Sequence, residues 1–560
     1  MRIVVAGIAI LLASCASQGE AGRESREYFG TLEPFAAEAV YFLLTDRFVD
    51  GDPANNFPEQ GGGPDTRTFD RPIHVPGYEP ANMGYLGGDF KGVLDNADYI
   101  ADMGFTAIWT TPIVDNPDEA FTGSRVPGRG PGGDRGKSGF HGYWGVNFFV
   151  VDEHLESADL AFADFTRELR DGHDLKYVLD VVCNHGSPAY TMPADQPKYG
   201  ELYGATGELV ADHENLHPSK LDTENPLHAF YNREPGLGEL SDLNENNPEV
   251  LDYFVAAYSQ WLDQGVDAFR IDTIAHMPNA YWKAFSDRIR QKRPGLFMFS
   301  ENFAYDANAI AANTWPENGQ ISVLDFPGKE AMNRVFADGA SYSELADYLH
   351  LESGLYHNPY ELMTFYDNHD MDRMDADTNG FIDANNWLFT SRGIPVVYYG
   401  SEIAFQAGTN EHTGNRNYFG QENVERAKSH PIHAALTRIA NLRKESVALQ
   451  RGLQVNALFL GDIAVFYRVY QKDGVAQTAL VVLNKGEIPA GVDVTKRLSA
   501  GTWTDAFTGE NFLVANDDAR LPVGVPPHGV RVLLFDQPVT NARLLGELNR
   551  LHAKARRKRP

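Results

Sequence analysis

Hydrophobic positions along this chain form short, continuously apolar runs, and stretches with helical spacing lie between them. Buried parallel strands that alternate with covering helices produce this pattern. The segment just before residue 266 is the clearest helix, with Pro248 near its start and Gly265 at its end. We predict strands at residues 39–45, 105–110, 176–182, 266–272, 296–301, 321–326, 362–367 and 395–400. Together these units predict an α/β fold, a (β/α)8 TIM barrel.

Two regions break the alternation. The span from about 183 to 246 is polar and rich in turn residues, which favours a long loop domain inserted after the third strand. After about residue 450 short alternating strands predict a C-terminal all-β sandwich. The predicted layout is a signal peptide at 1–15, a tether at 16–37, the barrel at 38–450, the sandwich at 451–537 and a basic tail at 538–560.

The basic tail is interpreted as a frayed, solvated end. Its charge also allows contact with anionic lipid or an acidic polymer.

Composition narrows the possible partners. A formal net charge of −29 opposes binding to nucleic acid, because an acidic surface repels phosphates. Hydrophobic residues make up 43% and aromatic residues 12%, which indicates a folded chain rather than an acidic disordered one. The acidic surface suits a neutral substrate and supplies oxygen ligands for hard cations. No protein partner is evident.

The first residues indicate export. An early arginine, a short apolar run and small residues precede Cys15, as in a signal peptide. The run is shorter than the ~20 apolar residues that span a bilayer. Its ending, L-A-S-C, resembles the lipobox of bacterial lipoproteins, so we expect membrane contact through a lipid anchor at Cys15, facing the periplasm or the cell surface. The alternative is ordinary secretion with cleavage nearby. Cys183 is the only other cysteine, which leaves the mature fold without an internal disulfide.

Polar side chains follow the apolar strands at the edge where barrel enzymes place their chemistry. Asp272, Glu301 and Asp370 follow three different predicted strands. Arg270 lies two positions before Asp272, so both side chains project to one face. Arg270 is the only obvious cation for these acids, and uncompensated acids at a barrel mouth indicate catalysis.

Retaining glycoside hydrolysis needs two carboxyl groups about 5 Å apart, one as nucleophile and one as acid and then base. Arg270 is expected to keep Asp272 ionised as the nucleophile. Burial after an apolar strand is expected to keep Glu301 protonated as the acid. Asp370 would stabilise the distorted sugar.

Seven blocks in order resemble the α-amylase family of glycoside hydrolases over roughly residues 39–535. Four of them are D-V-V-C-N-H, G-V-D-A-F-R-I-D-T-I-A-H, the Glu301 strand and F-Y-D-N-H-D. The accessory blocks are G-F-T-A-I-W-T-T-P, L-S-D-L-N and G-I-P-V-V-Y-Y-G-S-E. The resemblance implies that Asp272 is the nucleophile, Glu301 the acid/base and Asp370 the transition-state stabiliser. It further implies that Arg270 supports the nucleophile, that Tyr143 stacks on the sugar, and that the sugar contacts are His141, His185 and His369.

The acidic stretch D-R-F-V-D-G-D-P-A-N-N predicts a calcium site, because carboxylate and amide oxygens suit hard cations. It lacks the glycine and glutamate of an EF-hand. It resembles the N-terminal calcium loop of cyclodextrin glucanotransferases, which implies the ligands Asp50, Asp52, Asn55, Asn56, Gly87 (carbonyl) and Asp89. A second Ca2+, common in the family, would use Asn184, Asp242 and the His276 carbonyl, with a further ligand from residues 231–234.

The leading prediction is a hydrolase of α-1,4-glucans. The first alternative is a cyclodextrin glucanotransferase or another transglycosylase. Against it stand Ala275, where such enzymes usually have lysine, the absence of a central aromatic in 236–240, and the single β-domain. A catalytically silent glycan-binding protein is a third reading.

Overall fold

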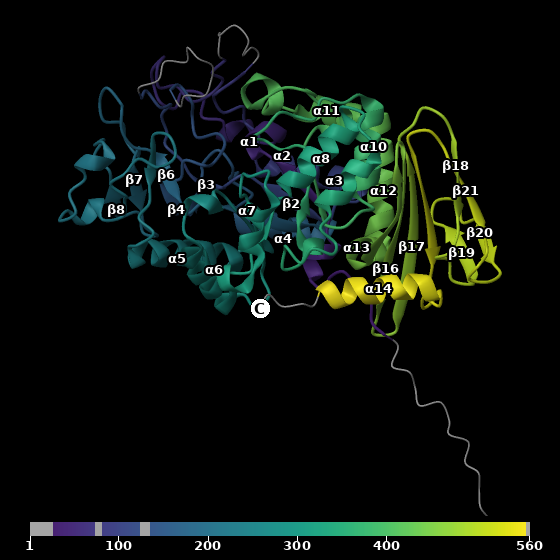
Figure 1. The fold of residues 1–560 in the computed structure, drawn as a ribbon. Helices are drawn as coiled ribbons and strands as arrows, with labels where there is room; N and C mark the ends of the chain where they lie inside the picture. Colours follow the sequence, from purple (N-terminus) through teal and green to yellow (C-terminus); the bar gives the residue numbers. More distant parts are fainter. Residues whose placement is uncertain (1–25, 73–80, 124–134, 556–560) are drawn as a thin grey trace, which may run out of the picture.

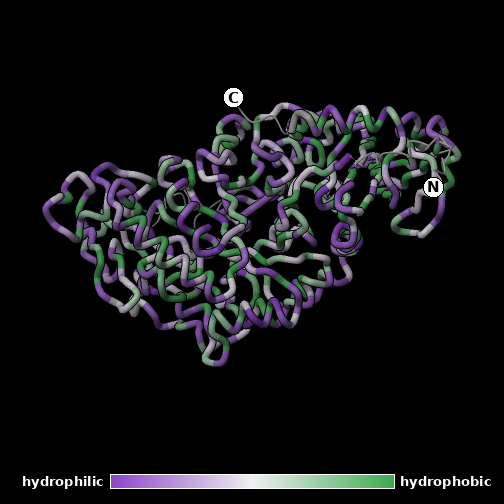
Figure 2. Tube along the Cα trace, turned by 90° about the horizontal axis from the view of Figure 1, so that it is seen from below, coloured by the Kyte–Doolittle hydropathy of each residue, from purple (hydrophilic) through white to green (hydrophobic). Residues whose placement is uncertain are grey.

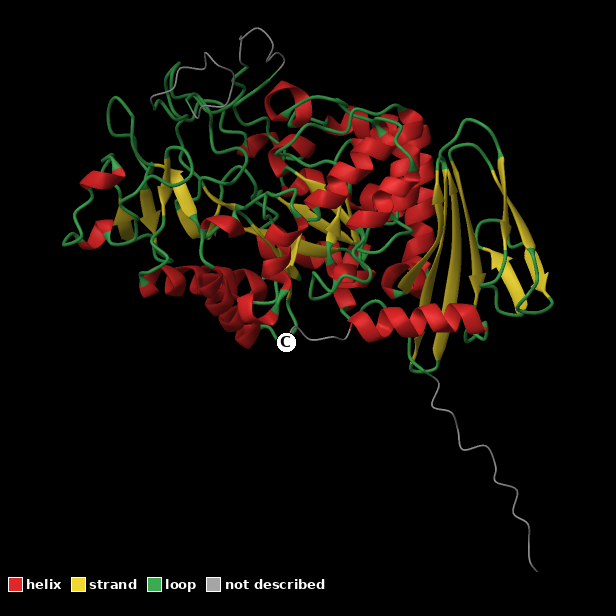
Figure 3. Ribbon diagram, in the orientation of Figure 1, coloured by secondary structure: helices red, strands yellow, loops and turns green. Residues whose placement is uncertain are grey.

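The computed structural model describes residues 26–72, 81–123 and 135–555. Two domains follow one another along the chain, a barrel surrounded by helices and a domain made mostly of strands (Figure 1). Figure 3 shows the helices around the barrel strands and one long helix crossing the end of the second domain. Within the described residues, no helix combines the length and apolar character needed to cross a bilayer.

Eight parallel strands form the barrel, which confirms the predicted fold class and every predicted strand. β1 pairs with both β2 and β14, and a bridge between Leu324 and Met363 joins the ends of the sheet. The strands are β1 (Val40–Leu43), β2 (Ala107–Thr110), β5 (Lys176–Val181), β10 (Ala268–Ile271), β11 (Phe297–Ser300), β12 (Ser322–Val323), β13 (Met363–Thr364) and β14 (Ile394–Tyr398).

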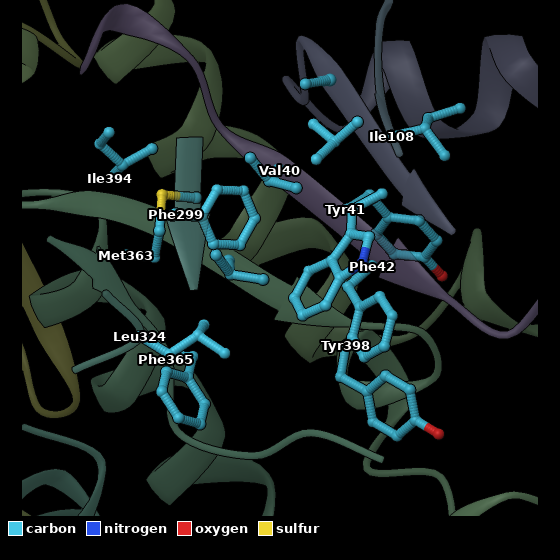
Figure 4. Close-up of a cluster of buried hydrophobic side chains, with 14 of the residues drawn as sticks. Val40, Tyr41, Phe42, Ile108, Phe299, Leu324, Met363, Phe365, Ile394 and Tyr398 are labelled. Carbon is cyan, nitrogen blue, oxygen red and sulfur yellow. The ribbon is translucent and has the colours of Figure 1, made fainter. Parts of the chain in front are cut away.

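The barrel is filled by large side chains from facing strands (Figure 4). Phe42 stacks on Trp109 with ring centroids 3.7 Å apart and lies 5.2 Å from the ring of Tyr398. Because such rings bury much apolar area, the short strands suffice to hold the sheet closed. Figure 2 shows hydrophilic stretches on many of the outer loops.

Amphipathic helices cover the outside of the barrel. In α5 the Asn247 side chain accepts the Glu249 N–H, Pro248 occupies the first turn, and Phe254 and Trp261 face inward, as the sequence predicts. The main covering helices are α4 (Phe162–His173), α5 (Pro248–Asp263), α6 (Asn279–Lys292), α8 (Phe326–Phe336), α10 (Thr378–Leu388) and α12 (Pro431–Glu445).

The polar span after β5 forms a small domain of its own, as expected. Two short antiparallel pairs organise it, and one of them places His185 opposite Asp242. Its strands are β6 (His185–Pro188), β7 (Glu201–Tyr203), β8 (Leu209–Asp212) and β9 (Leu240–Asp242). A shorter insertion carries β3 (Val114–Asp115) and β4 (Asn147–Val151).

The C-terminal domain holds a six-stranded sheet in the order β15-β16-β17-β22-β19-β20 and a β18–β21 pair. Its shared core includes Trp503 stacked on Phe535. The strands are β15 (Leu453–Leu460), β16 (Ile463–Lys472), β17 (Val475–Asn484), β18 (Ala490–Val494), β19 (Gly501–Asp505), β20 (Asn511–Val514), β21 (Leu521–Val525) and β22 (Gly529–Phe535).

The predicted tether is wrong for residues 26–37, which pack against the folded domains. Tyr28 is 2% exposed and exchanges two backbone hydrogen bonds with Gln471 of β16. Phe35 stacks on Phe297 at the start of β11 with ring centroids 4.7 Å apart. Aromatic side chains bury this segment, although the polar residues between them suggest a solvated chain.

The predicted frayed tail is also wrong over most of its length. Residues Ala542–Ala555 form helix α14, which packs beside β15. Leu544, Leu548 and Leu551 lie one helical turn apart and are buried in the core of the C-terminal domain. The sequence around these leucines is rich in basic residues, which is why the sequence alone is interpreted as a solvated tail.

Replacing Leu548 with alanine is expected to destabilise the protein by about 2–5 kcal/mol, because the side chain is fully buried. Thermal and denaturant unfolding measure the change. Leu513, which is 80% exposed, is the matched control, and Leu513→Ala should leave stability within about 0.5 kcal/mol. Equal effects of the two substitutions would mean that α14 is not docked.

Candidate active site

The residues that carry the two central carboxyl groups, Asp272 and Glu301, directly follow adjacent strands and are in register with each other. Ile271 pairs with Ser300 in the β10–β11 register, so Asp272 and Glu301 are the next residues on neighbouring strands. The Glu301 N–H donates to the Ile271 carbonyl at 2.8 Å, which continues the ladder to this point. Neighbouring strands are about 4.8 Å apart, a spacing that fits the roughly 5 Å between the carboxyl groups of retaining enzymes.

Arg270, in β10, contacts both of these acids through its guanidinium group. Its Nη1 lies 2.9 Å from Asp272 Oδ1 and 2.8 Å from Asp180 Oδ1, and its Nη2 lies 3.0 Å from Glu301 Oε2. The predicted pairing of Arg270 with Asp272 is confirmed. The expectation that Glu301 has no cation is wrong, because a guanidinium offers a fork of donors and serves several carboxylates at once.

Asp180, at the end of β5, holds this arrangement in place. It accepts hydrogen bonds from Tyr143 Oη at 2.9 Å and Trp109 Nε1 at 3.1 Å as well as from Arg270. A buried carboxylate with this many donors is fully satisfied. Asp180 therefore orients Arg270 and Tyr143 and is not the proton donor.

Burial raises the pKa of Glu301 well above its usual value; the Arg270 cation opposes this rise, and the negative charges of Asp370, Asp272 and Asp180 add to it. Its Oε1 is buried and has no hydrogen-bond partner among the described residues. A protonated carboxyl group with an uncommitted oxygen is suited to donate a proton to a ligand.

Three of the predicted sugar-contacting residues, His141, Tyr143 and His369, form a connected group beside Arg270. Tyr143 Oη lies 2.8 Å from His369 Nε2, and the Tyr143 N–H donates to His141 Nδ1 at 3.1 Å. Burial lowers the pKa of His141 and His369 well below the usual value, and the Arg416 cation adds to this, so both rings are neutral hydrogen-bonding groups. His185 is 3% exposed at the start of β6, with its Nδ1 3.4 Å from the Asn184 amide nitrogen.

Asp370 lies in the loop after β13, and its side chain is 27% exposed. Its Oδ2 is 3.2 Å from His369 Nε2. Its Oδ1 is 2.5 Å from Nη2 of Arg416, a residue that the sequence analysis missed. Arg416 follows β14 in a loop without strand or helix spacing, so periodicity gives no signal for it. Asp370 therefore also has a cation, contrary to expectation.

Two exposed aromatic side chains, also missed, follow Glu301 directly. Phe303 is 52% and Tyr305 42% exposed, and both rest on Phe326, with a Phe303–Phe326 centroid distance of 4.8 Å. Their position just beyond the strand end is the signal that could have found them. Exposed rings held by a buried one can stack on a sugar.

The acidic loop after β1 has the chemistry of a cation site. The side-chain oxygens Asp50 Oδ1, Asn55 Oδ1 and Asn56 Oδ1 are buried and lack hydrogen-bond partners among the described residues. A Cβ added at Gly87 would lie 2.4 Å from Asn56 Oδ1 and 2.9 Å from Asp50 Oδ2, so only glycine lets these oxygens approach. Uncommitted buried oxygens cost free energy unless a cation binds them.

The other two predicted ligands of this loop have different roles. Asp89 is fully buried and accepts the N–H groups of Gly51, Asp52 and Gly92, which shapes the loop. The Asp52 carboxylate accepts the Ala54 N–H and caps a short 3-10 helix at the surface. The oxygen set therefore fits a hard cation, and the Asp52 carboxylate serves as a helix cap.

The second predicted metal group is brought together only in part. The Leu243 N–H next to Asp242 donates to the Asn184 carbonyl, which places these two residues side by side, and His276 acts electrostatically on Asp242. Asp242 Oδ2 accepts the Asn232 amide at 2.8 Å, which ties Asp242 to the segment 231–234. A second cation held by Asn184, Asp242 and the His276 carbonyl stays a prediction.

Comparison with known proteins agrees with this geometry. The family described as "Alpha amylase, catalytic domain" matches residues 42–438. The chain is 30% identical over 497 residues to a cyclomaltodextrin glucanotransferase of Bacillus licheniformis, which covers 85% of this chain and 63% of that protein. It is 29% identical over 515 residues to an alpha-amylase of Niallia circulans, covering 87% and 88%. The chain thus spans less than two thirds of the Bacillus licheniformis relative.

A solved structure of a cyclomaltodextrin glucanotransferase, described as the first with a three-domain ABC distribution, superposes with a TM-score of 0.72 at 28% identity. The match covers 89% of this chain and 99% of that one.

Proposed function

Because this chain belongs to the α-amylase family of glycoside hydrolases, we propose that it hydrolyses α-1,4-glucosidic bonds of starch-type glucans or maltooligosaccharides with retention of configuration. One observation carries the proposal: Asp272 and Glu301 leave adjacent strands in register and share one buried guanidinium. That arrangement provides an anionic attacker and a proton donor on a common rim.

In the first step an Asp272 oxygen attacks the anomeric carbon and forms a glycosyl ester. The bond from that carbon to the leaving oxygen breaks, and Glu301 gives its proton to that oxygen. In the second step Glu301 takes a proton from water, the water oxygen attacks the same carbon, and Asp272 leaves as a carboxylate. Two inversions give net retention. Asp370 and the neutral imidazoles of His141 and His369 would hold the hydroxyl groups of the distorted ring.

Proton NMR of maltoheptaose hydrolysis tests the proposal, because it records the first anomer that is released. We expect the α-anomer, followed by slow mutarotation. Release of the β-anomer would contradict the mechanism. Absence of turnover on every α-glucan would favour the glycan-binding reading instead.

Transglycosylation is the second candidate, and it is favoured by the similarity to the Bacillus licheniformis and three-domain relatives, which are both cyclomaltodextrin glucanotransferases. The three-domain relative also weakens the argument from the single β-domain against transglycosylation, because that relative is a cyclomaltodextrin glucanotransferase with only three domains. Ala275 and the lack of an aromatic residue in 236–240 still favour hydrolysis, because they leave fewer contacts for a sugar acceptor. Chromatography of products from soluble starch decides: linear sugars support hydrolysis, and cyclic sugars support transfer.

We also propose that Asp50, Asn55 and Asn56, with Asp89 shaping the loop, hold Ca2+ as a structural cation that neutralises their oxygens. Calcium is expected to raise the free energy of unfolding by about 2.7 kcal/mol at 100 times its Kd, and a chelator should remove this gain. Thermal unfolding with calcium or chelator measures it. Asp50→Ala should abolish the shift, whereas Asp95→Ala, at an exposed acid in the next helix, should retain it. A calcium shift in Asp50→Ala as large as in the wild type would exclude this loop.

For localisation we propose export and lipid anchoring at Cys15, supported by the L-A-S-C ending of the apolar run. Labelling with a fatty-acid analogue in a bacterial host tests this. Cys15→Ala should lose the label and Cys183→Ala should keep it, and a label retained in Cys15→Ala would refute the anchor.

A further inference from the structure

A short segment, residues 415–419, joins the loop that carries Asp370 to the cation loop; we call it the strap. At its first end the Asn415 amide donates to the Asn368 carbonyl at 2.8 Å. Arg416 Nε donates to the His369 carbonyl at 2.9 Å while its Nη2 holds Asp370. This end of the strap therefore fixes both the backbone and the carboxylate of the Asp370 loop.

The other end is bonded to the cation loop. Tyr418 Oη accepts the backbone N–H of Asp50 at 2.8 Å. The Phe419 N–H donates to the Arg47 carbonyl at 2.8 Å, and the Phe419 ring stacks on Phe48 with an interplanar angle of 8°. The Asp50 backbone and the carboxylate expected to bind Ca2+ belong to one residue, so a change at the cation reaches Tyr418 directly.

The strap is held along its length, so it has little freedom to absorb a movement. Tyr399 Oη donates to the Asn417 carbonyl at 2.8 Å, and the guanidinium of Arg373 donates to the Asn415 carbonyl at 2.9 Å. Arg373 is itself 2% exposed. Arg416 and Tyr418 are separated by one residue, and packed, hydrogen-bonded segments of this kind transmit small displacements.

We propose that the strap couples the cation loop to Asp370, with Tyr418 and Arg416 as positioning residues, so that Ca2+ and the bound glucan strengthen each other's binding. The inference rests on the proposed function and its calcium site. An occupied cation loop fixes the Asp50 backbone, Tyr418 keeps the strap in register, and Arg416 then presents Asp370 to the sugar. Such coupling is reciprocal: each ligand must raise the affinity of the other by the same factor.

Titration calorimetry in a Glu301→Gln background, where turnover is strongly slowed, tests this. The Kd of Ca2+ is measured with and without saturating maltoheptaose, and the Kd of maltoheptaose with and without saturating Ca2+. We expect both to fall by the same factor, about 5-fold or more. Tyr418→Phe keeps the ring but removes the acceptor, and should bring the factor close to one while each ligand still binds.

Tyr253→Phe is the matched control, because that hydroxyl also bonds backbone groups, those of Tyr203 and Phe148, away from the strap. It should keep the full coupling factor. If Tyr418→Phe does not fold, Arg416→Lys tests the other end and should lose the coupling in the same way.

The outcomes separate the proposals. If both ligands bind but neither changes the affinity of the other, the proposed coupling through the strap is wrong, while hydrolysis and the calcium site are unaffected. The same conclusion follows if Tyr418→Phe keeps the full coupling factor. Absence of calcium binding in the background would overturn the calcium site and the coupling together. Wild-type protein that neither binds nor cleaves maltoheptaose would overturn the proposed function itself.

Discussion

Replacing Asp272 with alanine is expected to lower kcat on maltoheptaose by roughly 10^4 to 10^6-fold, the range that follows loss of a covalent nucleophile. The reason is geometric. The Asp272 side chain is held by Arg270 at 2.9 Å, and Glu301, an acid with a raised pKa, follows the adjacent strand β11. Without that carboxylate no glycosyl ester forms. Steady-state assays and sugar-binding titrations measure the loss and show that binding persists.

A small external anion should partly restore the reaction in Asp272→Ala. With α-maltosyl fluoride as substrate, azide enters the vacated space, attacks the anomeric carbon as fluoride leaves, and gives the β-azide. Asp263→Ala, at an exposed acid paired with Lys292, is the control and should have wild-type activity. Formation of the α-azide, or full activity without azide, would assign the nucleophile to another residue.

The sequence predicts the barrel well, because each strand is a continuous apolar run and its polar ending marks the catalytic rim. Asp272, Glu301 and Asp370 are recognisable for this reason, and the structure brings them together. Parallel strand pairing fixes the position of two of these acids: because Ile271 pairs with Ser300, Asp272 and Glu301 are neighbours.

What the sequence did not predict depends on contacts between distant segments. Arg416 reaches Asp370 from a loop after the last strand, and nothing in its local pattern distinguishes it from a solvated arginine. Helix α14 and residues 26–37 carry charged or polar residues between their buried ones, so local composition indicates solvent exposure where packing decides otherwise. In each case a side chain's role is set by a partner far along the chain: Asp370 is 46 residues from Arg416, and Asn549 is 523 residues from Arg26.

Replacing Glu301 with glutamine is expected to lower kcat on maltoheptaose by about 10²–10⁴-fold, the usual contribution of a general acid, and to remove the alkaline limb of the pH profile. In the wild type kcat/KM requires a proton on Glu301. Because burial raises the pKa of Glu301 well above 4.5, that proton is kept at pH values where an ordinary glutamate has lost it. Activity then falls as the pH rises through the raised value.

α-Maltosyl fluoride separates proton donation from the rest of the site, because fluoride leaves without being protonated. On this substrate Glu301→Gln should form the glycosyl ester at nearly the wild-type rate, with no alkaline limb, and then accumulate it, because no base remains to activate water. Mass spectrometry should detect the ester on Asp272.

A different buried acid could produce the alkaline limb of the pH profile instead, and Glu361 is the matched control. Burial raises the pKa of Glu361 to about 7, and this residue lies at the opposite end of the barrel beside the N-terminal segment. Glu361→Gln should keep the wild-type profile. A limb that persists in Glu301→Gln but disappears in Glu361→Gln would assign the titration to a conformational change rather than to proton donation at the rim.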